Sequence, residues 1–132
     1  MIISEDQIGQ ILRAAAKARE AAYAPYSRFA VGAAVLGVGG AIFAGCNVEN
    51  ASYGLTVCAE RVAIFKAVSE GERDIVAVAV VASGESPAAP CGACLQVMSE
   101  FGGPETIVVL ATTDGERREY RLGDLLPKPF KL

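Results

Sequence analysis

Three cysteines have the type and spacing to bind a single metal ion. Cys91 and Cys94 form a C-x-x-C pair directly after Pro90, and Cys58 begins the segment Cys58-Ala59-Glu60. A C-x-x-C pair alone is ambiguous, because zinc sites, redox pairs and ordinary helix starts all contain it. Cysteines three apart at a helix start project from one face, and Cys58 can add a third thiolate from a separate helix. Three protein ligands leave the fourth tetrahedral position of zinc for water, so the pattern indicates a catalytic zinc site.

Glu60 is the acid–base group that such a site needs. The sequence contains no histidine, which excludes Ser-His-Asp and Cys-His mechanisms and any histidine-ligated metal. We therefore expect Glu60 to take a proton from zinc-activated water and to deliver it to the substrate. The alternative is a small zinc-stabilised or redox domain built on Cys91 and Cys94, but a structural zinc would have a fourth protein ligand and no need of a carboxylate. Cys46, beside Gly45, is expected to be a buried apolar side chain and not a ligand.

The elements that must position these residues alternate between helices and strands. Helical spacing, apolar β-prone runs and glycine or proline breaks predict the following order: helix 4–23, strands 29–38 and 41–48 joined at Gly39-Gly40, helix 58–70, strand 75–82, helix 90–101, strand 106–111, then a short polar strand, a leucine-bearing turn and an exposed tail. This order predicts an α/β fold, a three-layer α/β/α sandwich with a single mixed sheet. We expect one catalytic domain over residues 1–132.

Length and composition narrow the possible functions. A chain of 132 residues can form a hydrophobic core without a metal or disulfides. With 12 basic and 15 acidic residues, it lacks the basic surface of a nucleic-acid-binding protein. We see no signal peptide and no apolar run long enough to cross a membrane, so we expect a soluble cytoplasmic protein with neither nucleic acid nor membrane as partner.

The metal motif is that of a known family. Cys58-Ala59-Glu60 paired with Pro90-Cys91-x-x-Cys94 is the signature of zinc-dependent deaminases. Together with the segment 47–53, Arg61, Leu125-Leu126-Pro127 and Phe130, it makes the sequence resemble the small homotetrameric cytidine deaminases from Tyr26 to Phe130.

The resemblance implies hydrolytic deamination of cytidine and deoxycytidine to uridine and deoxyuridine, with release of ammonia, in pyrimidine salvage. It also implies one zinc per subunit and a homotetramer whose active sites are shared between subunits. Related folds deaminate other amino-heterocycles, including blasticidin-type antibiotics, nucleotides and bases in RNA. The segment 47–53 argues against these substrates, and the acidic pI near 5.0 argues against RNA in particular.

The resemblance assigns substrate-binding roles to seven residues: Phe29, Asn47, Glu49, Ala51, Tyr53, Ala59 and Phe130. Asn47 and Glu49 would bind the ribose hydroxyls, which suits an amide and a carboxylate facing a diol. Phe29 would pack against the pyrimidine, and Tyr53 and Phe130 would reach the nucleoside across subunit boundaries. Each has a plainer alternative: Asn47 and Glu49 would only close their loop, Phe29 would point into the core, and Phe130 would anchor the C-terminus.

Three thiolates leave a zinc centre with net negative charge, which weakens zinc as a Lewis acid. Two helix N-termini, and Arg61 donating to thiolates, are expected to offset this charge. In the family the equivalent arginine has this role, whereas the alternative for Arg61 is a solvated surface charge. Many relatives carry a second arginine where this chain has Leu95. Either Arg61 carries more of the compensation here, or Leu95 fills an apolar contact without effect on zinc.

Overall fold

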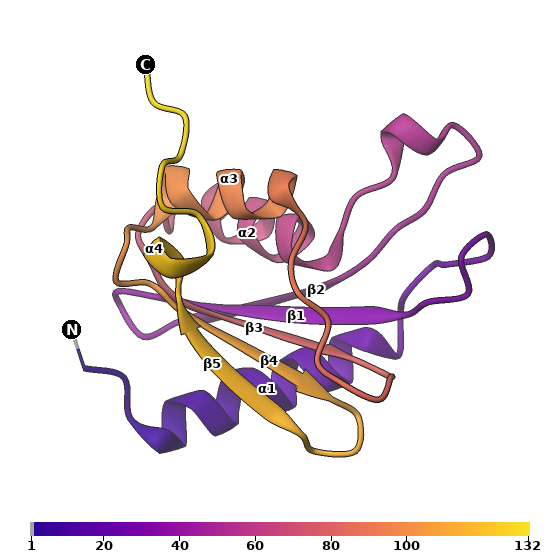
Figure 1. Cartoon of the computed structure of the whole chain (residues 1–132), viewed down its shortest axis with the longest axis horizontal. Helices are drawn as coiled ribbons and strands as arrows, with labels where there is room; N and C mark the ends of the chain where they lie inside the picture. Colours follow the sequence, from indigo (N-terminus) through magenta and orange to yellow (C-terminus); the bar gives the residue numbers. More distant parts are fainter. Residues whose placement is uncertain (1) are drawn as a thin grey trace.

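The computed structural model describes residues 2–132 as one five-stranded sheet with helices on both faces (Figure 1). The elements are α1 (Glu5–Arg19), β1 (Val31–Gly37), β2 (Ile42–Cys46), a 3₁₀ helix (Tyr53–Leu55), α2 (Ala59–Ser69), β3 (Ile75–Ala82), α3 (Gly92–Phe101), β4 (Ile107–Thr112), β5 (Arg117–Arg121) and α4 (Leu122–Leu125). The strand order is β2-β1-β3-β4-β5. Only β3 and β4 are parallel, and the other neighbouring strands are antiparallel.

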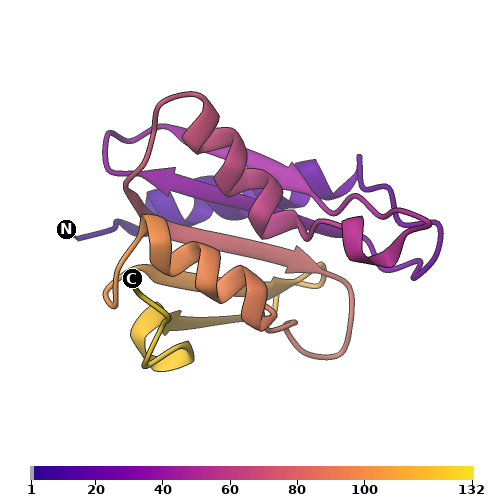
Figure 2. The same ribbon diagram turned by 90° about the horizontal axis from the view of Figure 1, so that it is seen from above.

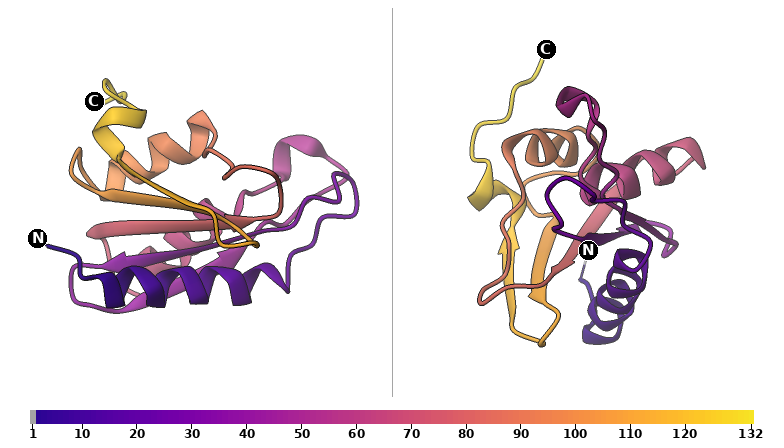
Figure 3. Two further views of the ribbon diagram at one scale, coloured as in Figure 1. Left: turned by 60° about the horizontal axis from the view of Figure 1, so that its bottom comes forward. Right: turned by 90° about the vertical axis from the view of Figure 1, so that its right-hand side faces the viewer.

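The helices form the two outer layers. α1 covers one face of the sheet, and α2 and α3 lie side by side on the other (Figures 1 and 2). The view in Figure 3 shows the same separation from the side of α1. The predicted α/β/α sandwich with a single mixed sheet is therefore confirmed.

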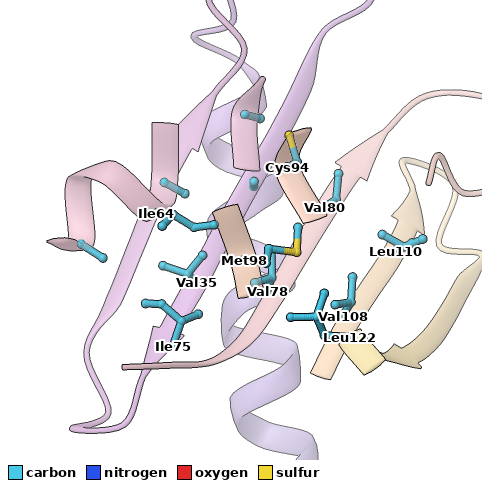
Figure 4. Packing of buried hydrophobic residues seen from close by; sticks show 14 residues of the cluster. Val35, Ile64, Ile75, Val78, Val80, Cys94, Met98, Val108, Leu110 and Leu122 are labelled. Atoms are coloured by element: carbon cyan, nitrogen blue, oxygen red, sulfur yellow. The ribbon is translucent and has the colours of Figure 1, made fainter. Parts of the chain in front are cut away.

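The core has two halves, one on each face of the sheet. Alternate residues of a strand point to opposite faces, so Val35 and Val78 join the half under α2 and α3, whereas Leu36 and Ala77 join the half over α1. Strand β3 contributes buried apolar side chains to both halves, which explains its uninterrupted apolar sequence. Figure 4 shows the first half closing around Met98 of α3. Helix α3 is thus fixed to the sheet by a buried side chain, and with it the residues at its N-terminus.

Several predicted boundaries differ from the structure, and three of them, at helix ends, have identifiable reasons. Helix α1 begins as predicted at the Ser4 cap, where Ser4 and Gln7 form a reciprocal capping box, but it ends at Arg19 rather than at Tyr23. Tyr23 instead pairs with the segment after β2: its amide donates to the Asn47 carbonyl at 3.0 Å, and its carbonyl accepts from the Glu49 amide at 2.8 Å. Helices α2 and α3 begin just after Cys58 and Cys91, because these cysteines are extended N-cap residues.

No helix within residues 2–132 is both long enough and apolar enough to span a membrane.

Candidate active site

The three predicted ligands converge where α2 and α3 begin. Cys58 and Cys91 are the N-caps of the two helices, and Cys94 lies in the first turn of α3. Cys58 Sγ lies 4.0 Å from Cys91 Sγ, Cys91 Sγ lies 3.5 Å from Cys94 Sγ, and the three sulfurs lie within 4.8 Å of one another. Tetrahedral zinc with Zn–S bonds of about 2.3 Å places its sulfurs about 3.8 Å apart. The three thiols therefore fit zinc, and Cys46 lies outside this group.

Positive charge surrounds the sulfurs. Both helices point their N-termini at the cluster, where the helix dipole favours negative charge. Arg61, in the first turn of α2, donates from Nη2 to Cys58 Sγ at 3.5 Å, and its Nε is buried without a partner among the described residues. Arg61 is therefore not a solvated surface charge.

The thiols of the metal-free cluster have very different proton affinities. Hydrogen bonding from Cys94, supported by Arg61, lowers the pKa of Cys58 to about 5. The hydrogen bond to Cys58 and burial raise the pKa of Cys94 above its ordinary value. Arg61 thus favours the thiolate form of the Cys58 sulfur that it contacts.

Glu60 is buried beside the cluster. Its side chain belongs to the second residue of α2, and the residue is only 5% exposed. Burial raises the pKa of Glu60, and the negative charge of Cys58 raises it further, whereas Arg61 lowers it. A carboxyl group whose pKa is raised toward neutrality is suited to both accepting and donating a proton.

A cavity of about 270 Å³ opens onto Glu60, Cys58 and Cys91. Four predicted substrate-binding residues line it: Phe29, Asn47, Glu49 and Ala59. The remaining wall comes from residues that the sequence did not single out: Ser27, Val31, Thr56, Val80, Ala88 and Ala89. Ala88 and Ala89 could have been predicted from the sequence. They directly precede Pro90-Cys91, so the chain must pass close to the cysteine cluster at these two residues.

Asn47 and Glu49 close their loop and line the cavity at the same time. The Asn47 side chain donates from Nδ2 to the Phe29 carbonyl at 2.8 Å and accepts at Oδ1 from the Val31 amide at 2.9 Å. Glu49 accepts from the amides of Tyr26 and Ser27 at 2.9 and 3.1 Å. The loop-closing interpretation is therefore correct for both, and it does not exclude contact with a ligand.

Phe29 lies on the cavity wall and is 40% exposed. The plainer alternative, that Phe29 points into the core, is wrong. The reason lies in its backbone, because both the Phe29 amide and carbonyl are held by side chains of the cavity wall and the ring is left outside the sheet.

Tyr53 and Phe130 do not reach this cavity within one chain. Tyr53 is 77% exposed on an arm that projects from the body of the molecule (Figure 1), and its ring lies edge to face with Tyr26 at a centroid distance of 6.2 Å. The hollow that these two rings line adjoins the cavity, because Ser27, Glu49 and Thr56 line both. Ala51 is exposed on the same arm. Phe130 is 70% exposed near the C-terminus. Its backbone is held by Gln96, which accepts from the Phe130 amide at 3.1 Å and donates to the Phe130 carbonyl at 3.0 Å.

Leu95 packs on the core. It is half-buried against the cluster of apolar residues under α2 and α3. Of the two alternatives for this position, the structure favours the apolar contact.

Comparison with known proteins agrees with this site. The family described as the cytidine and deoxycytidylate deaminase zinc-binding region matches residues 5–111. A cytidine deaminase of Halalkalibacterium halodurans is 54% identical over 120 residues, covering 91% of each chain. One of Sporosarcina psychrophila is 49% identical over 123 residues, covering 93% of this chain and 90% of the relative.

Solved structures show the same relationship. The crystal structure of cytidine deaminase from Burkholderia pseudomallei has a TM-score of 0.90 and 51% identity, covering 97% of this chain and all (100%) of that one. The enzyme from Mycobacterium tuberculosis has a TM-score of 0.81 and 45% identity, covering 95% of this chain and 98% of that one. Since the family match includes both helix starts and all three cysteines, the chain belongs to the cytidine deaminases, a family of zinc-dependent hydrolases.

Proposed function

We propose that this chain converts cytidine and deoxycytidine to uridine and deoxyuridine, consuming water and releasing ammonia. The single observation that carries the proposal is the convergence of three thiols and the buried Glu60 carboxyl on one cavity. The substrate named for the relatives above is consistent with it. One catalytic domain over residues 1–132 is part of the proposal.

Zinc would be held by Cys58, Cys91 and Cys94, one ion per chain. Within the described residues, no second group of three or more cysteine or carboxylate side chains converges in this way. When bound, zinc activates water at neutral pH and leaves room for it in the fourth coordination position. Arg61 and the two helix N-termini would offset the negative charge of the three sulfurs.

Glu60 would shuttle the proton. Its carboxylate takes the proton that water gives up and passes it to N3 of the pyrimidine as hydroxide adds to C4; it then takes the proton of the added hydroxyl and delivers it to the leaving amine. The buried position of Glu60 supports this role, because the raised pKa lets the group hold a proton between the two transfers. Water enters and ammonia leaves, so the carboxyl is returned to its starting state.

Four side chains would hold the nucleoside in the cavity. Phe29 offers an exposed aromatic face to the pyrimidine, and Ala59 lies at the α2 N-terminus beside it. Asn47 and Glu49 would bind the sugar hydroxyls with the hydrogen-bonding capacity that their loop bonds leave free. No lysine or arginine lines this cavity among the described residues, which supports a nucleoside rather than a nucleotide as substrate.

Tyr53, Ala51 and Phe130 would complete the site from neighbouring subunits of a homotetramer. Their exposure supports this arrangement, as does the fact that neither Tyr53 nor Phe130 is among the described residues that line their own chain's Glu60 cavity. The proposal includes a cytoplasmic location and a role in pyrimidine salvage.

The experiment that tests the proposal is an assay of ammonia release from five compounds: cytidine, deoxycytidine, cytosine, deoxycytidine monophosphate and adenosine. We expect turnover of the first two and little of the others. Faster turnover of deoxycytidine monophosphate or adenosine than of cytidine and deoxycytidine would reject the proposed substrate. Absence of turnover by verified zinc-loaded protein would reject the proposed reaction.

A further inference from the structure

The Ser27 hydroxyl connects two residues of the proposed nucleoside site. It donates a hydrogen bond to Glu49 Oε2, and it accepts from the Phe29 amide at 3.0 Å. Its backbone amide adds a bond to Glu49 Oε1 at 3.1 Å. The Phe29 amide donates to the Ser27 hydroxyl, which in turn donates to the Glu49 carboxylate. Because the two hydrogen bonds run in the same direction, each polarises and strengthens the other.

The loop that carries Ser27 is held in an uncommon conformation. Arg28, between Ser27 and Phe29, has a φ of 59°, in the left-handed region that a non-glycine residue seldom adopts. Such a conformation persists where surrounding contacts impose it. Here the contacts lie on both sides of Arg28, at the Glu49 carboxylate and at the Asn47 side chain, which binds the Phe29 carbonyl.

Hydrogen bonds orient the Glu49 carboxylate. Its side chain is long and half-exposed, so burial alone does not fix its orientation. An ionised carboxylate accepts roughly four hydrogen bonds. The loop supplies three of them, so capacity for a ligand hydroxyl remains while both oxygens are held.

We propose that Ser27 is a positioning residue, whose hydroxyl holds the Glu49 carboxylate in the orientation that accepts a hydrogen bond from the nucleoside sugar. The proposal rests on the proposed role of Glu49 in sugar binding. Ser27 acts through Glu49 and not on the pyrimidine, because the Phe29 backbone keeps its second anchor at Asn47.

The direction of the Glu49 titration agrees with this geometry. The hydrogen bond from the Ser27 hydroxyl is the main reason that the pKa of Glu49 lies below its ordinary value, and the two backbone amides lower it further. The hydroxyl therefore binds the charged carboxylate, the form that accepts a bond from a sugar hydroxyl.

The test compares two substrates in matched variants of the zinc-loaded enzyme. Cytidine has both sugar hydroxyls, and 2′,3′-dideoxycytidine has neither. For Ser27→Ala we expect the KM for cytidine to rise about fivefold or more, with kcat within about twofold of the unmodified enzyme. For 2′,3′-dideoxycytidine the KM should stay within about twofold, because the contact that Ser27 supports is absent.

Two further variants make the comparison specific. Ser27→Thr keeps the hydroxyl and should restore the KM for cytidine. Ser69→Ala removes an exposed serine hydroxyl at the C-terminal end of α2, away from the Glu60 cavity, and it should change neither KM. In ¹³C NMR titrations, Ser27→Ala should raise the pKa of Glu49, and Ser69→Ala should leave it unchanged.

Equal increases in KM for both substrates would overturn the proposal, since Ser27 would then act on the loop as a whole. If Ser27→Ala raises the pKa of Glu49 but leaves the KM for cytidine unchanged, the proposal is also overturned, because the lost hydrogen bond would then have no effect on sugar binding. Glu49→Gln separates this outcome from failure of the proposed function. If Glu49→Gln does not discriminate between the two substrates, Glu49 does not bind the sugar; if it does and Ser27→Ala does not, only the role of Ser27 is rejected.

Discussion

Gly45 connects the packing of the sheet to the geometry of the metal cluster. It lies in β2 against α2, the helix that begins at Cys58. A Cβ added at Gly45 would lie 2.8 Å from the Ala63 amide nitrogen and 2.8 Å from Val62 Cγ1. Ordinary contact begins at 3.4 Å, so α2 and β2 would have to separate by about 0.6 Å. Val62 can rotate, but the Ala63 backbone cannot move without the helix.

We therefore expect Gly45→Ala to destabilise the protein and to displace the start of α2 relative to α3. Overpacking of this kind costs about 1–3 kcal/mol of the free energy of unfolding. For a chain of this length, this corresponds to a fall in Tm of roughly 4–12 °C. Because a misplacement of about 1 Å can cost on the order of 100-fold in rate, we expect kcat/KM for cytidine to fall about tenfold.

Differential scanning calorimetry and steady-state kinetics on zinc-loaded protein measure both effects. Gly103→Ala is the matched control, because an added Cβ there meets nothing within 4 Å and its φ is not in the left-handed region. If Gly45→Ala and Gly103→Ala have the same Tm and the same kcat/KM, close packing of α2 on β2 does not hold the site in place.

Further predictions concern the metal, the proton shuttle and the assembly. Elemental analysis should find one zinc per chain, and removal of zinc by a chelator should abolish turnover until zinc is returned. Cys46→Ala should leave the zinc content unchanged, because Cys46 lies outside the cluster. Glu60→Gln should keep zinc and lose about 10²–10⁴-fold in kcat, since the amide keeps the shape but cannot shuttle a proton. Refolding Glu60→Ala chains together with Phe130→Ala chains should give more activity than either parent, because a hybrid can pair an intact Glu60 with a neighbour's Phe130.

The outcomes that would contradict these predictions are equally concrete. A stoichiometry near two zinc ions, or full activity after verified metal removal, would reject the proposed mechanism. A zinc-loaded Glu60→Gln enzyme with kcat reduced less than about tenfold would exclude Glu60 as the shuttle. Demonstrated hybrids without any gain in activity would confine Phe130 to its own subunit.

The sequence by itself indicated the candidate zinc ligands and most of the fold. Cys91 with Cys94, and Cys58 with Glu60, could be identified because short spacings at a helix start fix which side chains face the same way. That the two helix starts meet could be expected only from the family signature, because Cys58 and Cys91 lie on separate helices. The buried strand 75–82 could be placed to the residue, because a strand covered on both faces must be apolar throughout. The spacings and the strand are local, so one segment of sequence contains the information that specifies each of them.

Only the tertiary structure decided how the segment around Phe29 meets the segment around Glu49. The contacts that hold Phe29, Ser27 and Glu49 together use backbone amides and a carbonyl as well as side chains, and they join residues about 20 positions apart. Every non-proline residue carries the same amide and carbonyl, so the sequence contains no signal for such pairings. The same applies to the early end of α1, where Tyr23 leaves the helix to pair with Asn47 and Glu49. A competing partner from elsewhere in the chain decided the outcome at both places, and that partner becomes apparent only after folding brings it near.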